Sequence, residues 1–510
     1  MSTNHILETV VEKLTTELNN HCTEYGFKKR VKSKLPNLKL SVKTLIGNVL
    51  VAESKHSGKG YASIHLNKNW YGDSTRYKTK HSYRIFVERA YRGLIHLGYL
   101  SQVKAGVSHG SRGLYLTRYR ATSKLLNLFD PKSLIELPVL FAGQLEVSET
   151  IRVQHTHEEQ VPLKEVDKYG QPKTRTVKYR ELVEYEDTDQ TNQMRHNLQL
   201  INDRIATKWI DLELSREEHT DLITQMAKKD KEHLEESPDD YRPLMLSKRS
   251  LYRVFNDTEF QTGGRFYGGW WQEIPSKFRD RITIDGKRTV QLDYSGLHPH
   301  ILYHERSLEL EGDPYRVNLI PRKNAEDTGG FRKFIKKSFN AMLNADKVMK
   351  RPQRASKGKP KETLRHWGVT WKQVVKAIKE KHPDIEDQFF ASAGLRLQRI
   401  DSDLCEAVML ALIKRSSEIV VLPVHDSFIV HHGYKDELMA MMLGAYCLKY
   451  GYIPPPKLSK EMIVEITGVP DWGSWSSRPV DHDDLADLFD WAEMVPSERR
   501  LNLFRETSRH

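Results

Sequence analysis

The sequence is poor in cysteine and contains no long apolar run. Only three cysteines occur in 510 residues, Cys22, Cys405 and Cys447, and they form no CxxC pair. This pattern supports neither a disulfide framework nor a cysteine-rich zinc site. No apolar run reaches the roughly 20 residues that a membrane-spanning helix needs, and the N-terminus lacks the basic and apolar regions of a signal peptide. We therefore expect a cytoplasmic protein that contacts no membrane.

Basic residues outnumber acidic ones, which gives a net charge of +12 at pH 7. Such an excess favours a polyanionic partner, because each Lys or Arg that neutralises a phosphate releases condensed counterions. Charge alone does not identify that partner, since many basic proteins bind no nucleic acid. It gains weight only where it coincides with motifs.

Two charged, turn-rich stretches divide the chain. In the first, residues 149–189, Val, Tyr and Leu alternate on both sides of a Tyr-Gly-Gln-Pro turn, which predicts a projecting β-hairpin. The second, residues 228–243, is typical of a charged helix end followed by a Pro-containing turn. We therefore expect an N-terminal domain at 1–135, a connector with a hairpin and helices at 136–240, a large domain at 241–475 and a helical tail at 476–510.

The N-terminal part shows a regular order of elements. Apolar residues recur at helical spacing over residues 41–53, and a later amphipathic helix stops at Gly98 before a short strand. A basic glycine turn then leads into another strand within GSRGLYLTRYRAT. This order resembles the winged-helix domains of DNA-binding regulators and replication initiators, although a small α/β domain with solvated basic residues is the alternative. The basic side chains expected at phosphates are Arg84, Arg112, Arg118 and Arg120, together with Arg76, Lys78 and Lys80.

Two aspartates stand where predicted strands end. Asp293 follows the apolar residues 289–292 and precedes a Ser-Gly turn, and Asp426 lies at the tip of a predicted hairpin in EIVVLPVHDSFIVHH. A carboxylate at such a position is held rigidly and is accessible to a metal ion. Two of them can hold a pair of Mg²⁺ ions about 3.5–4 Å apart.

The segments around and between these aspartates resemble family A DNA polymerases and single-subunit phage RNA polymerases. DYSGLHPHILYH is similar to motif A, VHDSFIV to motif C, and GGFRKFIKKSFNAMLNA to motif B, the fingers helix. LRLQRIDSDLCEAVMLALIK is similar to the glutamine-containing helix before motif C. The likeness covers about residues 245–470. It implies an α+β fold with a right-hand-like polymerase palm and fingers, preceded here by the winged-helix domain.

The resemblance also implies an activity and a set of roles. The chain would be a template-directed nucleotidyltransferase, a DNA polymerase of a plasmid, phage or mobile element, with a DNA template, a primer and nucleoside triphosphates as partners. Its cofactor would be two Mg²⁺ ions, with Mn²⁺ as an alternative. The residues concerned are Asp293 and Asp426 as metal ligands and catalytic residues, Arg332 with Lys336 or Lys337 at the triphosphate, His298 beside the sugar, and Gln398 and His425 at the primer end.

The sequence departs from the family pattern at three points. His298 replaces the glutamate that excludes a 2′-hydroxyl, Asn344 and Ala345 stand where the Tyr-Gly of motif B is usual, and Ser427 replaces the glutamate of motif C. The bulk of His298 favours deoxynucleotides, whereas Ser427 is typical of RNA polymerases; a hydrogen-bonded structural role for His298 is also open. An RNA-synthesising primase or transcriptase and a non-catalytic replication initiator therefore remain as alternatives.

Two further segments have alternative interpretations. Residues 263–279 combine glycines, Arg265 and two adjacent tryptophans, which suits either stacking on template bases or packing in a core. Residues 347–367 are basic and punctuated by Pro and Gly, which suits a loop along template phosphates or a solvated surface loop.

Overall fold

The computed structural model describes residues 3–24, 26, 35–53, 61–71, 76–77, 81–106, 116–129, 149–166, 172–234, 244, 246, 248–349, 360–450 and 458–461. These residues form a mixed α/β protein with two separate hydrophobic cores. One core lies in the N-terminal part, and the other begins at Ile151. The tail expected at 476–510 and the wing residue Arg112 lie outside the described residues.

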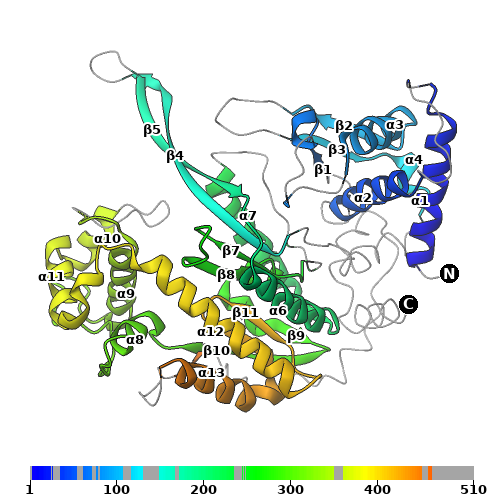
Figure 1. Ribbon diagram of the computed structural model, residues 1–510. Helices are drawn as coiled ribbons and strands as arrows, with labels where there is room; N and C mark the ends of the chain where they lie inside the picture. Colours follow the sequence, from blue (N-terminus) through cyan, green and yellow to red (C-terminus); the bar gives the residue numbers. More distant parts are fainter. Residues whose placement is uncertain are drawn as a thin grey trace.

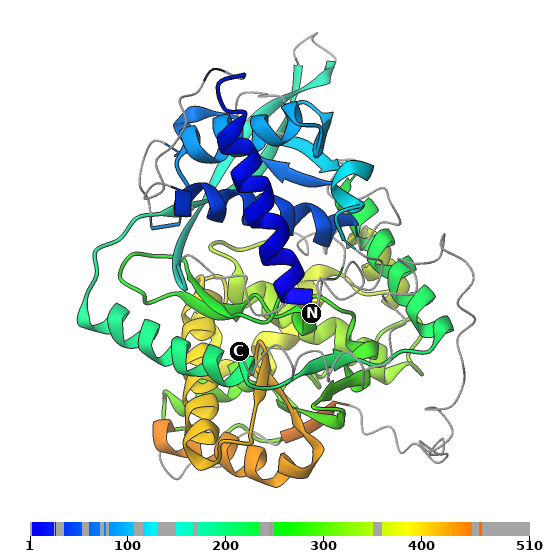
Figure 2. The ribbon, with the colours of Figure 1, turned by 90° about the vertical axis from the view of Figure 1, so that its right-hand side faces the viewer.

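The N-terminal core is built from helices packed on a small sheet. The helices are α1 (Thr3–Asn20), α2 (Leu35–Glu53), the π-helix η3 (Arg84–Tyr91), α3 (Arg92–His96) and the short α4 (Ser123–Leu126). Strands β1 (Ala62–Ile64), β2 (Leu100–Lys104) and β3 (Thr117–Ala121) pair antiparallel in the order β1-β3-β2. Helix α1 crosses α2 (Figure 2), and the Lys43–Glu8 ion pair of 2.6 Å joins them. Gly98, with φ of 75°, ends the helix as the sequence predicts.

A long hairpin leads into the second core. Strands β4 (Ile151–Val166) and β5 (Pro172–Val183) pair antiparallel and project from the body (Figure 1), as the sequence predicts. At its base β4 pairs in parallel with β7 (Tyr252–Phe255), which pairs antiparallel with β8 (Gly263–Tyr267). The hairpin is therefore part of a four-stranded sheet of order β5-β4-β7-β8.

The central sheet of the second core has six strands. They are β6 (Ile210–Leu212), β9 (Ile282–Ile284), β10 (Lys287–Tyr294), β11 (Val421–Val424), β12 (Ser427–His431) and β13 (Leu458–Glu461). The order along the sheet is β11-β12-β10-β9-β6. Strand β13 pairs with Gln291–Tyr294 of β10, whereas β9 pairs with Lys287 and Arg288 of the same strand. Strand β10 is buried through Val290, Gln291 and Leu292, which agrees with the apolar strand expected before Asp293.

Helices surround these sheets (Figure 1). They are α6 (Asp189–Ala206), α7 (Arg216–Leu234), α8 (Leu297–His304), α9 (Thr328–Asn344), α10 (Pro360–Trp367), α11 (Trp371–Lys381), α12 (Ala393–Arg415) and α13 (Lys435–Tyr450), with short 3-10 turns that include η6 (Trp270–Gln272). Helix α10 occupies the end of the basic stretch 347–367, so this end is not a loop; residues 350–359 lie outside the described part of the chain.

One hydrophobic core extends across the domain boundary expected near residue 240. Ile151, Leu198 and Ile210 belong to the same cluster as Phe255, Leu404 and Ile429. Arg204 of α6 donates a hydrogen bond of 3.1 Å to the carbonyl of Ile419. The hairpin and α6 are thus packed into the large domain.

The two adjacent tryptophans belong to this core. Trp270 and Trp271 are both fully buried, and the indole Nε1 of Trp271 donates to the carbonyl of Pro423 at 3.1 Å. Buried indole N–H groups are commonly satisfied in this way. The alternative in which these rings stack on template bases is therefore wrong, and they support strand β11 instead.

Candidate active site

Strand register brings Asp293 and Asp426 together. Asp293 of β10 lies opposite Ser427 of β12, the residue that directly follows Asp426. Val424 pairs with Ser427, so His425 and Asp426 form a two-residue hairpin turn, with His425 in the left-handed region at φ of 58°. Both carboxylates are partly exposed at one end of neighbouring antiparallel strands. This is the arrangement that the sequence predicts.

Ser427 fixes the turn from inside the protein. Its side chain is 4 % exposed, accepts a hydrogen bond of 2.7 Å from Gln291 and donates one of 3.0 Å to the carbonyl of Val424. The hydroxyl therefore holds the two strands in register. Its position does not favour contact with a substrate.

Helix α9 places its basic face beside Tyr315. The side chain of Asp327 caps the helix by accepting from the N–H of Gly330 at 2.8 Å, and the apolar residues of the helix, among them Phe334 and Phe339, are buried. Arg332 and Lys336 lie 5.2 and 5.7 Å from the ring centroid of Tyr315.

Tyr315 links this helix to the carboxylates. Burial raises its pKa, and the charges of Asp426 and Asp293 raise it further. The phenol therefore lies within electrostatic range of both aspartates and next to both cations. Lys337 is exposed and points about 100° away from Lys336 around the helix axis. Of the two lysines that the sequence offers, Lys336 is the one beside Tyr315.

Asp313 holds Arg332 in a two-pronged ion pair. The Arg332 Nε donates to Oδ2 at 2.5 Å, and Nη2 donates to Oδ1 at 3.0 Å. Asp313 Oδ1 also accepts from the N–H of Tyr315 at 2.9 Å. Burial raises the pKa of Asp313, but the hydrogen bonds from Arg332 outweigh it and the pKa is lowered. Asp313 was not among the residues expected from the sequence.

A buried carboxylate, Asp401 of α12, joins two more side chains at the site. It is 1 % exposed and lies 2.9 Å from His298 Nε2, and Arg265 donates to both of its oxygens. Burial raises the pKa of Asp401, yet the hydrogen bond to His298 and the charge of Arg265 lower it overall. The charge of Asp426 in turn helps to raise the pKa of Arg265. Arg265 is therefore bound to protein, and His298 is hydrogen-bonded to a buried carboxylate, which is compatible with either of the roles that the sequence leaves open.

A buried arginine anchors α12 so that Asp401 meets these partners. Arg253 is fully buried and donates to the Gly264 carbonyl at 2.7 Å and to Glu406 at 2.9 Å. Gly264 has φ of 80°, and a Cβ there would lie 2.7 Å from a ring carbon of Phe255 and 3.0 Å from Ser402 Oγ. Only glycine fits such an approach between strand and helix.

The remaining residues expected at the primer end lie near the same centre. The ring of His425 is 6.3 Å from that of Tyr267, in an edge-on arrangement, and burial with the charge of Arg265 lowers the pKa of His425. Gln398 is half-buried and precedes Asp401 by three residues on α12. Residues three apart share a helix face, so Gln398 faces the side of α12 that carries Asp401.

The basic residues of the N-terminal part belong to a different core. Arg84 and Arg120 are exposed, and Arg118 lies 4.6 Å above the ring of Tyr61. Arg118 and Arg120 share the outer face of β3. Arg76 is different, because it pairs with Glu184 at 3.0 Å and with Asp187 at 2.7 Å at the base of the hairpin. The expectation that Arg76 meets phosphate is therefore not supported.

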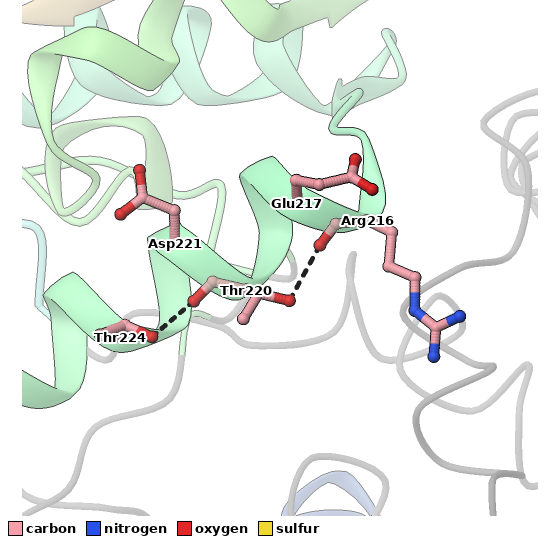
Figure 3. Close-up of a pocket in the computed structure, with 5 residues that line it drawn as sticks. All are labelled: Arg216, Glu217, Thr220, Asp221 and Thr224. Carbon is pink, nitrogen blue, oxygen red and sulfur yellow. Dashed lines mark hydrogen bonds between the residues drawn. The ribbon is translucent and has the colours of Figure 1, made fainter.

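An open hollow of about 500 Å³ lies along α7, lined by Arg216, Glu217, Thr220, Asp221 and Thr224 (Figure 3). Thr220 and Thr224 donate to backbone carbonyls of their own helix at 2.9 and 2.7 Å. None of the predicted site residues lines it. Within the described ranges, no group of three or more His, Cys, Asp or Glu side chains is arranged to hold a metal. The described helices likewise include none long and apolar enough to cross a membrane.

Neither a protein-family model nor a curated protein sequence matches the chain. Among solved structures, the chain has a distant likeness to the Pol domain of Pol1 from M. smegmatis in complex with a DNA primer–template and dNTP. The identity is 15 % and the TM-score 0.28, and the match covers 46 % of this chain and 50 % of that one. The chain thus spans about half the length of that domain. Likeness of this degree establishes neither a common fold nor an activity.

Proposed function

We propose that the chain is a template-directed DNA polymerase whose catalytic residues are Asp293 and Asp426. The observation that carries this proposal is the position of the two aspartates at one end of paired strands β10 and β12. The basic face of α9 lies beside Tyr315, whose hydroxyl is within electrostatic range of both carboxylates. In such an arrangement the carboxylates can bind metal ions, and the cationic side chains can bind the phosphates of a triphosphate.

The two carboxylates fit divalent metal ions. They supply hard oxygen ligands, both are partly exposed, and two protein carboxylates with substrate phosphates are a common ligand set for Mg²⁺. When bound, a pair of Mg²⁺ ions would activate the primer 3′-hydroxyl and stabilise the leaving pyrophosphate. Mn²⁺ has the same ligand preference and is the alternative.

The protein side chains would position the substrates. Arg332 and Lys336 supply N–H donors to the triphosphate, and Asp313 keeps the Arg332 fork in one orientation. His298 would lie beside the sugar, where Asp401 fixes its ring. Gln398 and His425 would contact the primer end. Holding both reactants in place removes much of the entropic barrier to the reaction.

A preference for deoxynucleotides follows from two side chains. The feature that favoured RNA synthesis was Ser427, but this hydroxyl is buried and used by Gln291 and Val424. Because a buried carboxylate holds His298, its ring beside the sugar would be a rigid barrier to a 2′-hydroxyl. An RNA-synthesising primase or RNA polymerase remains the second candidate, and nucleotide choice separates the two.

The N-terminal part would recruit the enzyme to DNA as a winged-helix domain. Its three antiparallel strands and preceding helices, with Arg118 and Arg120 on the outer face of β3, support this role. A polymerase with such a domain would suit the replication of a plasmid, phage or other mobile element. A non-catalytic initiator would need the same domain but not two matched aspartates.

The test is extension of a labelled primer–template with Mg²⁺ and either deoxy- or ribonucleotides. We expect deoxynucleotide incorporation that Asp426→Ala abolishes. We also expect His298→Ala to raise ribonucleotide use relative to deoxynucleotide use by at least about tenfold, while His300→Ala in the same helix does not. Ribonucleotide preference of the wild type would support the RNA-synthesising candidate. DNA binding without incorporation of either set would support the initiator.

A further inference from the structure

Four side chains share one face of the sheet that joins the candidate catalytic centre to the β4–β5 hairpin. They are Arg152, Arg180, Tyr252 and Tyr267, called here the Tyr252–Tyr267 strip. The Arg152 guanidinium lies 3.8 Å above the ring of Tyr252, whose centroid is 6.2 Å from that of Tyr267. Burial raises the pKa of Tyr267 overall, although the positive charge of Arg180 lowers that pKa. Tyr267 in turn contacts His425, the neighbour of Asp426.

Strand register places the whole strip on one face of the sheet β5-β4-β7-β8. Tyr252 pairs with Tyr267, and Arg152 pairs with Val254, two residues from Tyr252. Arg180 pairs with Thr156, four residues from Arg152. Side chains two or four apart on a strand share a face.

The two faces of this sheet differ in burial. The opposite face carries Ile151, Val153 and Phe255, which are fully buried in the core. The strip residues are partly or fully exposed. Farther along the hairpin, Glu158 lies on the strip's face and pairs in register with Lys178. The face of the strip is therefore an open, mainly basic and aromatic surface that begins at the catalytic turn.

We propose that the Tyr252–Tyr267 strip binds the sugar–phosphate backbone of the primer strand in the nascent duplex, and that the β4–β5 hairpin continues this surface away from the catalytic centre. The inference rests on the proposed function, because the strip leads to the turn that would hold the primer end. Arginine guanidinium and tyrosine hydroxyl groups are ordinary donors to phosphate oxygens.

The length of the hairpin suits this partner. Strand β4 has 16 residues, which corresponds to about 50 Å of strand. A duplex rises about 34 Å per helical turn, so the hairpin can follow at least one turn of product. The hairpin projects from the body (Figure 1), and Leu182 near its base is 41 % exposed and belongs to neither of the two described cores.

The test is the affinity of the full chain for a fluorescent primer–template, measured by anisotropy without nucleotide over a range of salt concentrations. We expect Arg180→Ala and Arg152→Ala each to weaken binding roughly tenfold and to lower the salt slope by about 1. The charge-reversed Arg180→Glu should weaken binding further. Arg415→Ala is the matched control, since Arg415 is an exposed arginine about 20 Å along α12 from Asp401.

Two results would overturn the proposal. One is unchanged primer–template affinity in Arg180→Glu, an exposed position where the variant should fold, as thermal unfolding would check. The other is an equal loss of affinity for a single-stranded oligonucleotide, which would assign the strip to an unpaired template. Extension by the wild type at saturating primer–template tests the proposed function independently, because this binding assay requires no catalysis.

Discussion

At the scale of single residues, Asp313 is the side chain that fixes the cationic end of the site. It engages Nε and Nη2 of Arg332, and among the described residues nothing forms a hydrogen bond with Nη1. A guanidinium held in this way loses less entropy when it binds a ligand. Asp313 therefore acts on the nucleotide through Arg332.

Replacing Asp313 with Asn should weaken nucleotide binding. We expect KM for the incoming nucleotide to rise about tenfold with a smaller change in kcat, and Asp313→Glu to restore part of the loss. Glu311→Gln, at an exposed acid two residues earlier, is the control. Steady-state kinetics at fixed primer–template measure this, and a loss confined to kcat would contradict the assigned role.

His304 makes stability depend on pH. It is 4 % exposed, its Nδ1 lies 2.6 Å from the Tyr446 hydroxyl, and burial lowers its pKa to about 4. Because the folded pKa lies below the unfolded value, the folded state favours the neutral ring. Stability is therefore fully present above about pH 6.5 and is lost as the pH falls towards 4.

We expect the free energy of unfolding to be on the order of 2 kcal/mol lower at pH 5 than at pH 7 from this group. His304→Asn should reduce that difference while lowering stability at pH 7. Urea unfolding at both pH values is the measurement. An identical pH dependence in wild type and variant would exclude His304 as a cause.

The positions of some of these residues could be predicted from the sequence, and the positions of others could not. The positions of Asp293 and Asp426 at strand ends could be predicted because each stands beside a strand that can be recognised locally. Asp401 could not, since its partners His298 and Arg265 are 103 and 136 residues away. Asp313 is 19 residues from Arg332 and has no motif of its own.

At the scale of elements, the approach of β8 to α12 decides where Asp401 lies. Gly264→Ala would place a methyl group against Phe255 and Ser402 in a left-handed backbone conformation. We expect a loss of about 2–4 kcal/mol in the free energy of unfolding, from strain and overpacking together. Gly444→Ala is the control, because a Cβ there meets nothing within 4 Å and α13 should gain up to about 1 kcal/mol. Denaturant unfolding of both variants checks this, and equal stabilities would refute the packing account.

Local patterns predicted elements better than their pairing. The β4–β5 hairpin, the Asp426 hairpin and the helix ending at Gly98 follow from alternation and turn residues. The parallel pairing of Ile151 with Arg253 joins segments about a hundred residues apart and leaves no local signal. The same is true of Trp270 and Trp271, whose burial depends on strand β11.

At the scale of the whole molecule, polar contacts join residues 76 and 77 to the hairpin base, and Tyr77 packs against the second core. Arg76 bonds to Glu184 and Asp187, and Tyr77 donates to the Val183 carbonyl at 2.8 Å. This short segment, which lies between β1 and η3 in the sequence, is therefore tied to the hairpin that carries the strip. The basic excess of the chain could be read from composition, but not which arginines are already paired within the protein.

The central claim is that Asp293 and Asp426 form one catalytic unit. The most direct test is single-turnover incorporation of one deoxynucleotide into a bound primer–template by the wild type, Asp293→Asn, Asp426→Asn and the double variant. We predict that each single variant loses at least about 10³-fold in rate and that the double variant loses little more, because residues acting as a unit are not additive. Incorporation by either single variant at a rate within about tenfold of the wild type would contradict the account.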